Sequence, residues 1–112
     1  LHDIGKNLVA IMLRGVGFKV IDLGINVSPE TFVTSIQEHD ADILALSALL
    51  TTTMPKMKQT IDAVVEAGLR EKIKIIVGGA PVTHEFAKKI GADGYAETAG
   101  SASRTAQELM TV

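Results

Sequence analysis

The residue near the start of the chain with the clearest capacity for metal chemistry is His2, in the segment Leu1–Gly5. Imidazole is the commonest side-chain ligand for metals, and a glycine such as Gly5 lets a bulky planar group approach the main chain. The plainer interpretation is a histidine at a helix end and a glycine in a turn. These two residues alone leave both interpretations open.

Two further segments carry hydroxyls or glycines where apolar runs end. Four hydroxyl side chains fall within Ser47–Thr53. Unpaired hydroxyls are costly to bury, so this cluster indicates a ligand, although Thr53 could instead cap the helix that follows. Gly78-Gly79 is either a flexible turn or a space in which a ligand passes close to the main chain.

Other polar residues have local explanations. His39 falls at a predicted helix C-terminus, where a partly cationic side chain suits the helix dipole. His84 begins a predicted helix, and the sequence shows no partner for it. Gly15-Val16-Gly17 lacks the third glycine of a dinucleotide-binding fingerprint. The sequence contains no P-loop, nucleophile elbow or paired carboxylates, so no residue is predicted to be catalytic.

The elements that position these residues alternate between helix and strand. Apolar residues recurring every three or four positions predict helices, and short apolar runs ending in glycine or hydroxyl residues predict strands. The predicted helices are 4–16, one starting at Ser28-Pro29, one from Pro55 to near Gly68, 83–90 and 101–110. The predicted strands are 18–23, 43–47, 72–77 and 94–96.

Burial can be predicted for three of these elements. The 4–16 helix is apolar on most sides, which suits burial against a sheet. The 43–47 strand is apolar without alternation, so it is expected to be buried on both faces. In the helix that opens at Pro55, four side chains are expected to point inward: Met57, Ile61, Val64 and Val65.

This alternation predicts an α/β fold, a doubly wound parallel sheet with helices on both faces. In such folds ligands bind beyond the carboxyl ends of the strands, where segments 1–6, 47–53 and 78–83 are expected to meet. The first element is a helix with no strand before it. We therefore expect a central strand upstream of Leu1 and regard residues 1–112 as one domain of a longer protein.

The composition excludes several classes of function. The chain has no cysteine, so disulfides, thiol nucleophiles and thiolate metal sites are excluded. Its formal net charge of -2, without a basic cluster, argues against a nucleic-acid partner. No apolar run reaches the ~20 residues that cross a bilayer, and no signal-peptide pattern is visible. A cytoplasmic domain is expected.

Together the three segments resemble the signature of corrinoid (cobalamin)-binding domains. The matching motifs are H-x-x-G at His2–Gly5, S-x-L at Ser47–Leu49 and G-G at Gly78-Gly79. The resemblance covers essentially the whole chain, and Ser47–Met54 and Gly78–Thr83 look closer to the methyl-transferring branch than to the mutases. It implies a flavodoxin-like, Rossmann-like fold and an upstream helical domain that caps the cofactor.

The resemblance implies a metal ligand. His2 would coordinate the lower face of cobalt in place of the cofactor's own base, and Gly5 would give room for the cofactor's tail. In the family an acidic residue two positions before the histidine holds its other ring nitrogen, and that position precedes Leu1. Asp3 is adjacent to His2 at a different offset, and Thr53 matches a position where some relatives carry a serine in the same relay.

The resemblance also implies a slot for the nucleotide tail beside the sheet. Gly78 and Gly79 would leave that slot open. Ser47 would hydrogen-bond the tail, Leu49 would pack against it, and Thr51 would lie near the corrin edge.

By this resemblance the domain is a carrier that is not catalytic by itself, within one-carbon metabolism. Its cofactor would take a methyl group from a substrate:corrinoid methyltransferase and give it to a second methyltransferase with a thiol or pterin acceptor. Two alternatives remain: the corrinoid domain of an adenosylcobalamin-dependent mutase, and a flavodoxin-like regulatory module without corrinoid. A receiver-type module would need an acidic cluster at the strand ends, which the sequence lacks.

Overall fold

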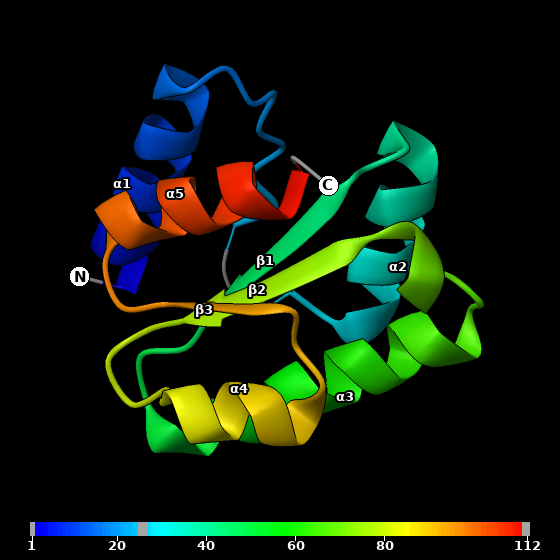
Figure 1. Cartoon of the computed structure of the whole chain (residues 1–112). Coiled ribbons are helices and arrows are strands. Elements are labelled where there is room, and N and C mark those ends of the chain that lie inside the picture. Colours follow the sequence, from blue (N-terminus) through cyan, green and yellow to red (C-terminus); the bar gives the residue numbers. More distant parts are fainter. Residues whose placement is uncertain (1, 25–26, 111–112) are drawn as a thin grey trace.

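The computed structural model describes residues 2–24 and 27–110, and the side chains from residue 6 onward within those ranges. Three parallel strands form one sheet in the order β1-β2-β3: β1 (Ile43–Ser47), β2 (Lys74–Gly78) and β3 (Gly94–Ala96). The helices are α1 (His2–Gly15), α2 (Pro29–His39), α3 (Met54–Glu66), α4 (His84–Ile90) and α5 (Ala99–Met110), with 3₁₀ turns η1 (Thr51–Thr53) and η2 (Arg70–Lys72). Helices α1 and α5 cover one face of the sheet, and α2, α3 and α4 cover the other (Figure 1). The predicted doubly wound parallel α/β fold is confirmed.

Local signals in the sequence set the helix boundaries on both sides of β1. The Ser28 hydroxyl accepts the backbone N–H of Thr31, and Pro29 occupies the first turn of α2, as predicted. Asp40 ends α2 in the left-handed conformation, with its N–H bonded to the Ile36 carbonyl. These caps satisfy backbone groups that a helix end otherwise leaves without partners.

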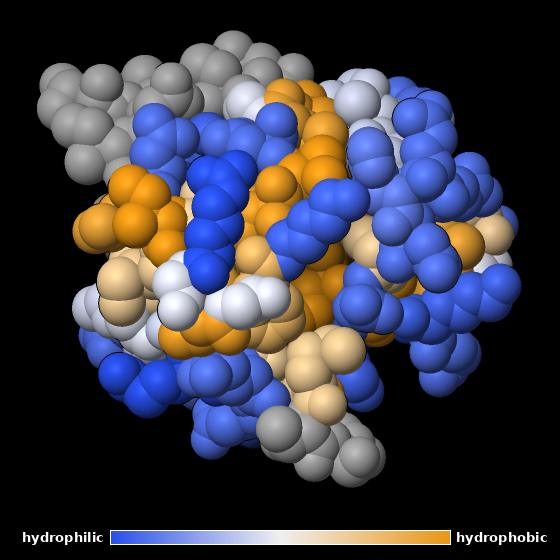
Figure 2. All heavy atoms as spheres, turned by 90° about the horizontal axis from the view of Figure 1, so that it is seen from above, coloured by the Kyte–Doolittle hydropathy of each residue, from blue (hydrophilic) through white to orange (hydrophobic). Residues whose placement is uncertain are grey.

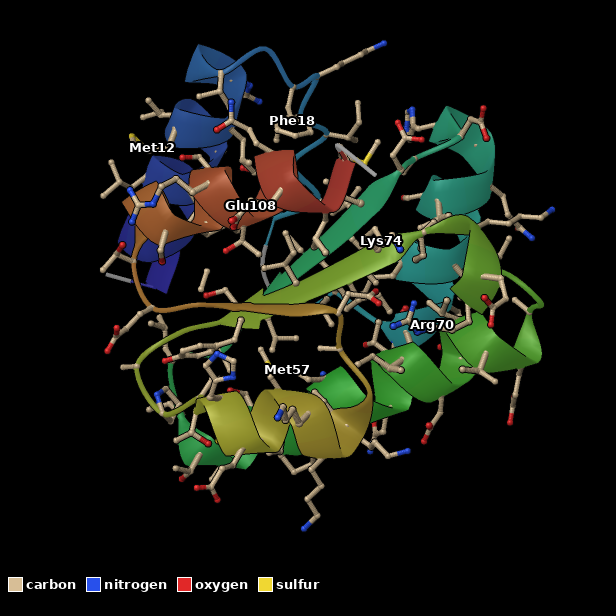
Figure 3. The ribbon with its side chains drawn as sticks, in the orientation of Figure 1. Met12, Phe18, Met57, Arg70, Lys74 and Glu108 are labelled. Carbon is tan, nitrogen blue, oxygen red and sulfur yellow. The ribbon has the colours of Figure 1, made fainter. Side chains whose placement is uncertain are left out.

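The larger core lies between the sheet and the α2–α3–α4 layer. Val64, Ile75 and Val77 are fully buried there, and Met57 points into the same layer (Figure 3). Burying an aliphatic side chain of this size contributes roughly 1.5–3 kcal/mol. Val65, predicted to point inward, is 54% exposed. It lies eight positions after Met57, about 80° round the helix, which takes it off the buried stripe.

The second core lies under α5. It consists of Ile76 and the small residues Ala96, Ala102 and Ala106, with Phe18 packed against its edge. Alanine side chains let the helix lie close to the sheet. Figure 3 shows Phe18 between the end of α1 and α5.

The segment Phe18–Leu23 was predicted to be a strand, and this prediction is wrong. The segment is not part of the sheet in the structure, although it follows α1 directly. A strand requires a neighbouring strand for its ladder as well as a suitable sequence. Within the described part of the chain, the sheet pairs only β1 with β2 and β2 with β3.

The predicted burial of β1 on both faces is also wrong, whereas α1 packs against the α5 side of the core with Val9 and Leu13, as its apolar character predicts. Ala45 and Ser47 are exposed, whereas Leu44 and Leu46 on the opposite face of β1 are buried. On α1, Ala10 is buried, yet large apolar side chains elsewhere on the helix and the connection after it are exposed: Leu8, Ile11, Met12, Val16 and Ile21. Figure 2, which looks onto the α1–α5 layer, shows apolar atoms gathered across this face between polar side chains.

Candidate functional site

The S-x-L and G-G segments lie side by side at the carboxyl edge of the sheet. Ser47 is paired with Gly78 in the β1–β2 register, and the Ala48 N–H donates to the Gly78 carbonyl at 3.1 Å. The end of β3, the start of α5 and the start of α1 lie on the same side of the molecule, at the left of Figure 1. The prediction that these segments meet at one edge is confirmed for β1 and β2, and the main chain at the start of α1 lies on the same side.

Ser47 presents a hydroxyl on the side of the sheet that faces α1 and α5. Strand side chains alternate between faces, so Ser47 shares this face with Ala45 and Ile43, and Ile43 packs on the core under α5. Both Ala45 and Ser47 are exposed, and the Ser47 hydroxyl has no hydrogen bond to any described residue. A narrow polar group of a ligand that lay along the end of β1 would be within reach of the Ser47 hydroxyl and would have room beside the small Ala45 side chain.

The turn after β1 presents apolar and hydroxyl groups together. Leu49 is 37% exposed and Leu50 is 54% exposed, and the exposed residues of η1 follow directly. Thr53 does not cap α3 with its side chain, contrary to one of the two roles predicted for it. Its hydroxyl donates to the Leu50 carbonyl at 2.7 Å, because a threonine in a helical turn reaches back to a preceding carbonyl.

The two glycines of the G-G segment are required by the chain itself. A β-carbon on Gly78 would lie 2.7 Å from the carbonyl oxygen of Ala96, and one on Gly79 would overlap the backbone of Ala48. Gly79 also has a φ of +116°, in the region that favours glycine. This close approach of neighbouring backbones was not among the two interpretations predicted for the segment, a flexible turn or a space for a ligand.

The histidine segment begins α1. The helix starts at His2 and not at Ile4, and it includes Gly5, because a single glycine costs a helix only about 1 kcal/mol. The side chains of His2 and Asp3, and the surroundings of Gly5, lie outside the described part of the structure. The roles predicted for these three residues therefore stay predictions.

The end of β3 also belongs to this edge, although it was not predicted to do so. Ala96 is paired with Gly78, and Thr98 and Ser101 then start α5 by a reciprocal cap. The Ser101 N–H donates to the Thr98 hydroxyl at 3.0 Å, and the Thr98 N–H donates to the Ser101 hydroxyl at 2.9 Å. The Thr-x-x-Ser spacing is a helix-start signal that could have identified this turn.

The two other histidines differ in their surroundings. His39 is exposed at the C-terminus of α2, as predicted. His84 is exposed too, but the prediction that nothing pairs with it is wrong, since its ring lies 5.2 Å from that of Tyr95. Among the described residues, no three His, Asp or Glu side chains are grouped closely enough to hold a metal ion.

A hollow of about 290 Å³ lies at the opposite, amino end of the strands. Arg70 and Asp93 form an ion pair there at 2.9 Å, and Asp93 also accepts the backbone N–H of Ile75 at 2.7 Å. Arg70 donates in addition to the carbonyls of Gly91 and Ile73. Figure 3 shows Arg70 and Lys74 at this end, away from the carboxyl edge. These contacts hold the start of β2 against the turn before β3 and stabilise the fold.

A parallel α/β sheet with motif segments at its carboxyl edge is the architecture of a ligand-binding domain. Residues 1–103 match the B12 binding domain family, and the chain belongs to that family. No helix of the described residues has the length and apolar character needed to cross a membrane.

Three relatives indicate the branch of the family that this chain resembles. It is 47% identical over 110 residues to dimethylamine corrinoid protein 3 of Methanosarcina mazei, covering 98% of this chain and 66% of the relative. The structure of the Methanosarcina barkeri monomethylamine corrinoid protein matches with a TM-score of 0.93 and 41% identity, over 97% of this chain and 52% of that one. A chain of the methanol:cobalamin methyltransferase complex from Methanosarcina barkeri matches with a TM-score of 0.89 and 37% identity, over 96% and 41%. The chain thus spans about half the length of most of these relatives.

The cofactor of the domain is a corrinoid, and the residues at the carboxyl edge fit it. The Ser47 hydroxyl, which has no hydrogen-bond partner in the described part of the chain, and the exposed Ala45 on the same face suit the polar tail of a corrinoid. Exposed Leu49 and Leu50 provide apolar surface against which apolar parts of the cofactor would pack. The alternative of a regulatory module without corrinoid does not agree with this family membership.

Proposed function

We propose that this domain holds its corrinoid with His2 as the lower ligand of cobalt and carries a methyl group between two methyltransferases. When bound, the corrinoid supplies a cobalt centre that takes up and releases the methyl group. The chain supplies the lower ligand, the contacts to the tail and the positioning of both. The names of these relatives refer to dimethylamine, monomethylamine and methanol systems. This favours methyl transfer over radical rearrangement as the function of the domain.

The observation that carries this proposal is the pairing of Ser47 with Gly78 at the carboxyl edge. It brings two of the three motif segments into one place, on the side from which α1 starts. We propose that the tail lies against Ala45 and Ser47, on the α1–α5 side of the sheet. Gly78 and Gly79 then contribute by letting the strand ends approach closely.

The partners belong to the proposal as well. We expect one methyltransferase that loads the corrinoid from a small methylated substrate and a second that passes the group to a thiol or pterin. We place both reactions on other domains or chains; among the described residues, no three His, Asp or Glu side chains are grouped closely enough to hold a metal ion of their own.

A further part of the proposal concerns the rest of the protein. We propose that another strand lies between β1 and the segment Phe18–Leu23, and that a helical domain caps the cofactor. Two observations support the strand. Phe18–Leu23 has no strand partner among the described residues, and within the same part of the chain β1 pairs with a strand on one side only.

The test of His2 ligation is a spectroscopic comparison of three histidine variants. In the holo-protein reduced to Co(II), nitrogen hyperfine structure in the EPR spectrum should change when the protein is labelled with ¹⁵N-histidine. His2→Ala should abolish that isotope effect, whereas the matched controls His39→Ala and His84→Ala should retain it. An isotope effect that survives in His2→Ala would show that another group ligates cobalt.

The test of methyl carriage follows the absorption spectrum of the cofactor. The reduced holo-protein should be methylated by methyl iodide and then demethylated by a methyltransferase with a thiol or pterin acceptor. A protein that is methylated but never demethylated, and that supports adenosyl-dependent isomerisation with a barrel subunit, would favour the mutase alternative.

A further inference from the structure

Lys6 and Asp22 form a two-pronged ion pair between α1 and the connection that follows it. The Lys6 ammonium lies 2.9 Å from Oδ1 and 2.7 Å from Oδ2 of Asp22, and it also donates to the Asn7 amide oxygen at 2.9 Å. The Lys6 and Asp22 side chains are 24% and 31% exposed. A partly buried pair with both carboxylate oxygens engaged is better defined than an ordinary surface pair.

Asp22 is held from a second direction. Its Oδ1 accepts the backbone N–H of Gly24 at 2.9 Å, and Gly24 has a φ of +89°. The carboxylate thus closes the turn that leads toward α2 while it binds Lys6. Moving Asp22 would require this turn to open.

The connection after α1 runs back along the helix and is fastened to it at three points. The Phe18 N–H donates to the Leu13 carbonyl, Arg14 donates to the Val20 carbonyl at 3.4 Å, and Lys6 binds Asp22. The last of these contacts lies nearest to the start of the helix. These three contacts link the segment directly to α1.

Lys6 follows His2 by four residues, which is one turn of the helix. The first turn of a helix lacks part of its internal hydrogen bonds and frays readily. The ion pair of Lys6, one turn after the start of α1, limits the movement of the residues that precede it.

We propose that the Lys6–Asp22 ion pair is a positioning device for the lower ligand of cobalt, holding the first turn of α1 against the Asp22–Gly24 turn. The inference rests on the proposed role of His2. Lys6 and Asp22 are positioning residues: they act on the direction in which the first turn presents its ligand. The pair therefore affects how firmly the corrinoid is held in its histidine-ligated form.

The test compares two ion pairs in the holo-protein. Lys6→Met removes the charge and retains the apolar stem, and Lys6→Arg restores the charge. Lys58→Met is the matched control, because Lys58 pairs with Asp62 at 2.5 Å on the exposed face of α3. The readouts are the apparent Kd for hydroxocobalamin, the fraction of the Co(II) EPR signal that responds to ¹⁵N-histidine, and the Tm of the apo-protein.

Lys6→Met should raise the Kd about tenfold, the scale seen when residues that orient metal ligands are removed, and it should lower the ¹⁵N-sensitive fraction. Lys58→Met should change neither the Kd nor the ¹⁵N-sensitive fraction. Lys6→Arg should restore both quantities most of the way to their wild-type values. A Lys6→Met protein with a Kd and an EPR fraction like those of the wild type would overturn the positioning role while leaving the proposed function intact. If His2→Ala retains the isotope effect, the proposed function itself is wrong and this inference falls with it.

Discussion

The backbone of Ala48, at the end of β1, occupies the space that a β-carbon on Gly79 would need. The two residues belong to different motif segments, and the contact fixes how closely the ends of β1 and β2 approach. It also determines which substitutions can probe the cofactor site. A substitution at Gly79 would destabilise the fold itself, so it would not measure the contribution of Gly79 to cofactor binding.

Gly79→Ala is expected to destabilise the apo-protein by about 2–4 kcal/mol, from overpacking together with an unfavourable positive φ. Gly91→Ala is the control, because Gly91 also has a positive φ of +87° but has open space around its Cα. It should cost only about 1–2 kcal/mol from the left-handed conformation. Urea unfolding of both variants measures the difference, and equal costs would argue against the contact with Ala48.

Substitutions on the open face of β1 should report on the cofactor without disturbing the fold. Ala45→Leu and Ser47→Val place larger groups on exposed positions, so the free energy of unfolding of the apo-protein should change by no more than about 0.5 kcal/mol. Corrinoid retention through gel filtration should fall severalfold, because the proposed path of the tail is narrowed and the Ser47 hydroxyl is lost. Glu38→Leu, at an exposed position on α2, serves as a control for added apolar surface. Unchanged retention in both β1 variants would place the tail elsewhere.

The Lys6–Asp22 pair predicts a pH dependence of stability. The Lys6 ammonium, the Gly24 N–H and the more distant charge of Arg14 hold the pKa of Asp22 below its ordinary value. A depressed folded-state pKa stabilises the protein above the unfolded-state value of about 3.9, and that stabilisation is lost as the pH falls through the folded-state value. The Tm difference between wild type and Asp22→Asn should therefore be constant from about pH 5 to 7 and shrink below about pH 4. Thermal unfolding across this range tests it, and a difference independent of pH would contradict the ion pair.

The contacts of Asp93 with Arg70 and with the Ile75 N–H, at the amino end of the strands, should affect the free energy of unfolding and leave cofactor binding unchanged. Asp93→Ala removes the acceptor of the Ile75 N–H, and leaving a buried donor without a partner costs about 1–3 kcal/mol. Asp93→Asn keeps an acceptor and should cost less. Urea unfolding gives the cost, and the Kd for hydroxocobalamin should match that of the wild type in both variants. A weakened Kd in a folded Asp93→Asn protein would show that the two ends of the sheet are coupled.

The sequence predicted the strands that are bounded by clear signals. β1 and β3 have the expected bounds, and α2 begins after the predicted Ser28 cap. Phe18–Leu23 has the composition of a strand but pairs with no described strand, and composition does not supply a partner. Ala45 was misjudged for a related reason: whether a small apolar residue is covered depends on elements elsewhere in the chain.

The candidate site was predictable as a set of segments and only partly as a geometry. Motif spacing indicated that Ser47 and Gly78 would share one edge, because parallel strands end together. It could not indicate that Gly79 meets Ala48, or that Asp22 returns to Lys6, since both depend on how the backbone folds back. The Thr53 hydroxyl donates to the Leu50 carbonyl, three residues before it. This could not be predicted either, because a threonine at such a position can form several different hydrogen bonds.

The pairing of Ser47 with Gly78 has a consequence for how this domain tolerates insertions and deletions. Side chains of a strand alternate, so a slip of one residue in β1 would turn Ser47 toward α3 and bring Leu46 to the face that Ser47 now occupies. An added residue inside β1 would thus exchange a hydroxyl for a leucine at the edge. The same residue added in the turn 67–73 would leave the ladder untouched. Length variation among relatives of this domain is therefore expected in its turns and helices, with the strands that carry the motifs constant in length.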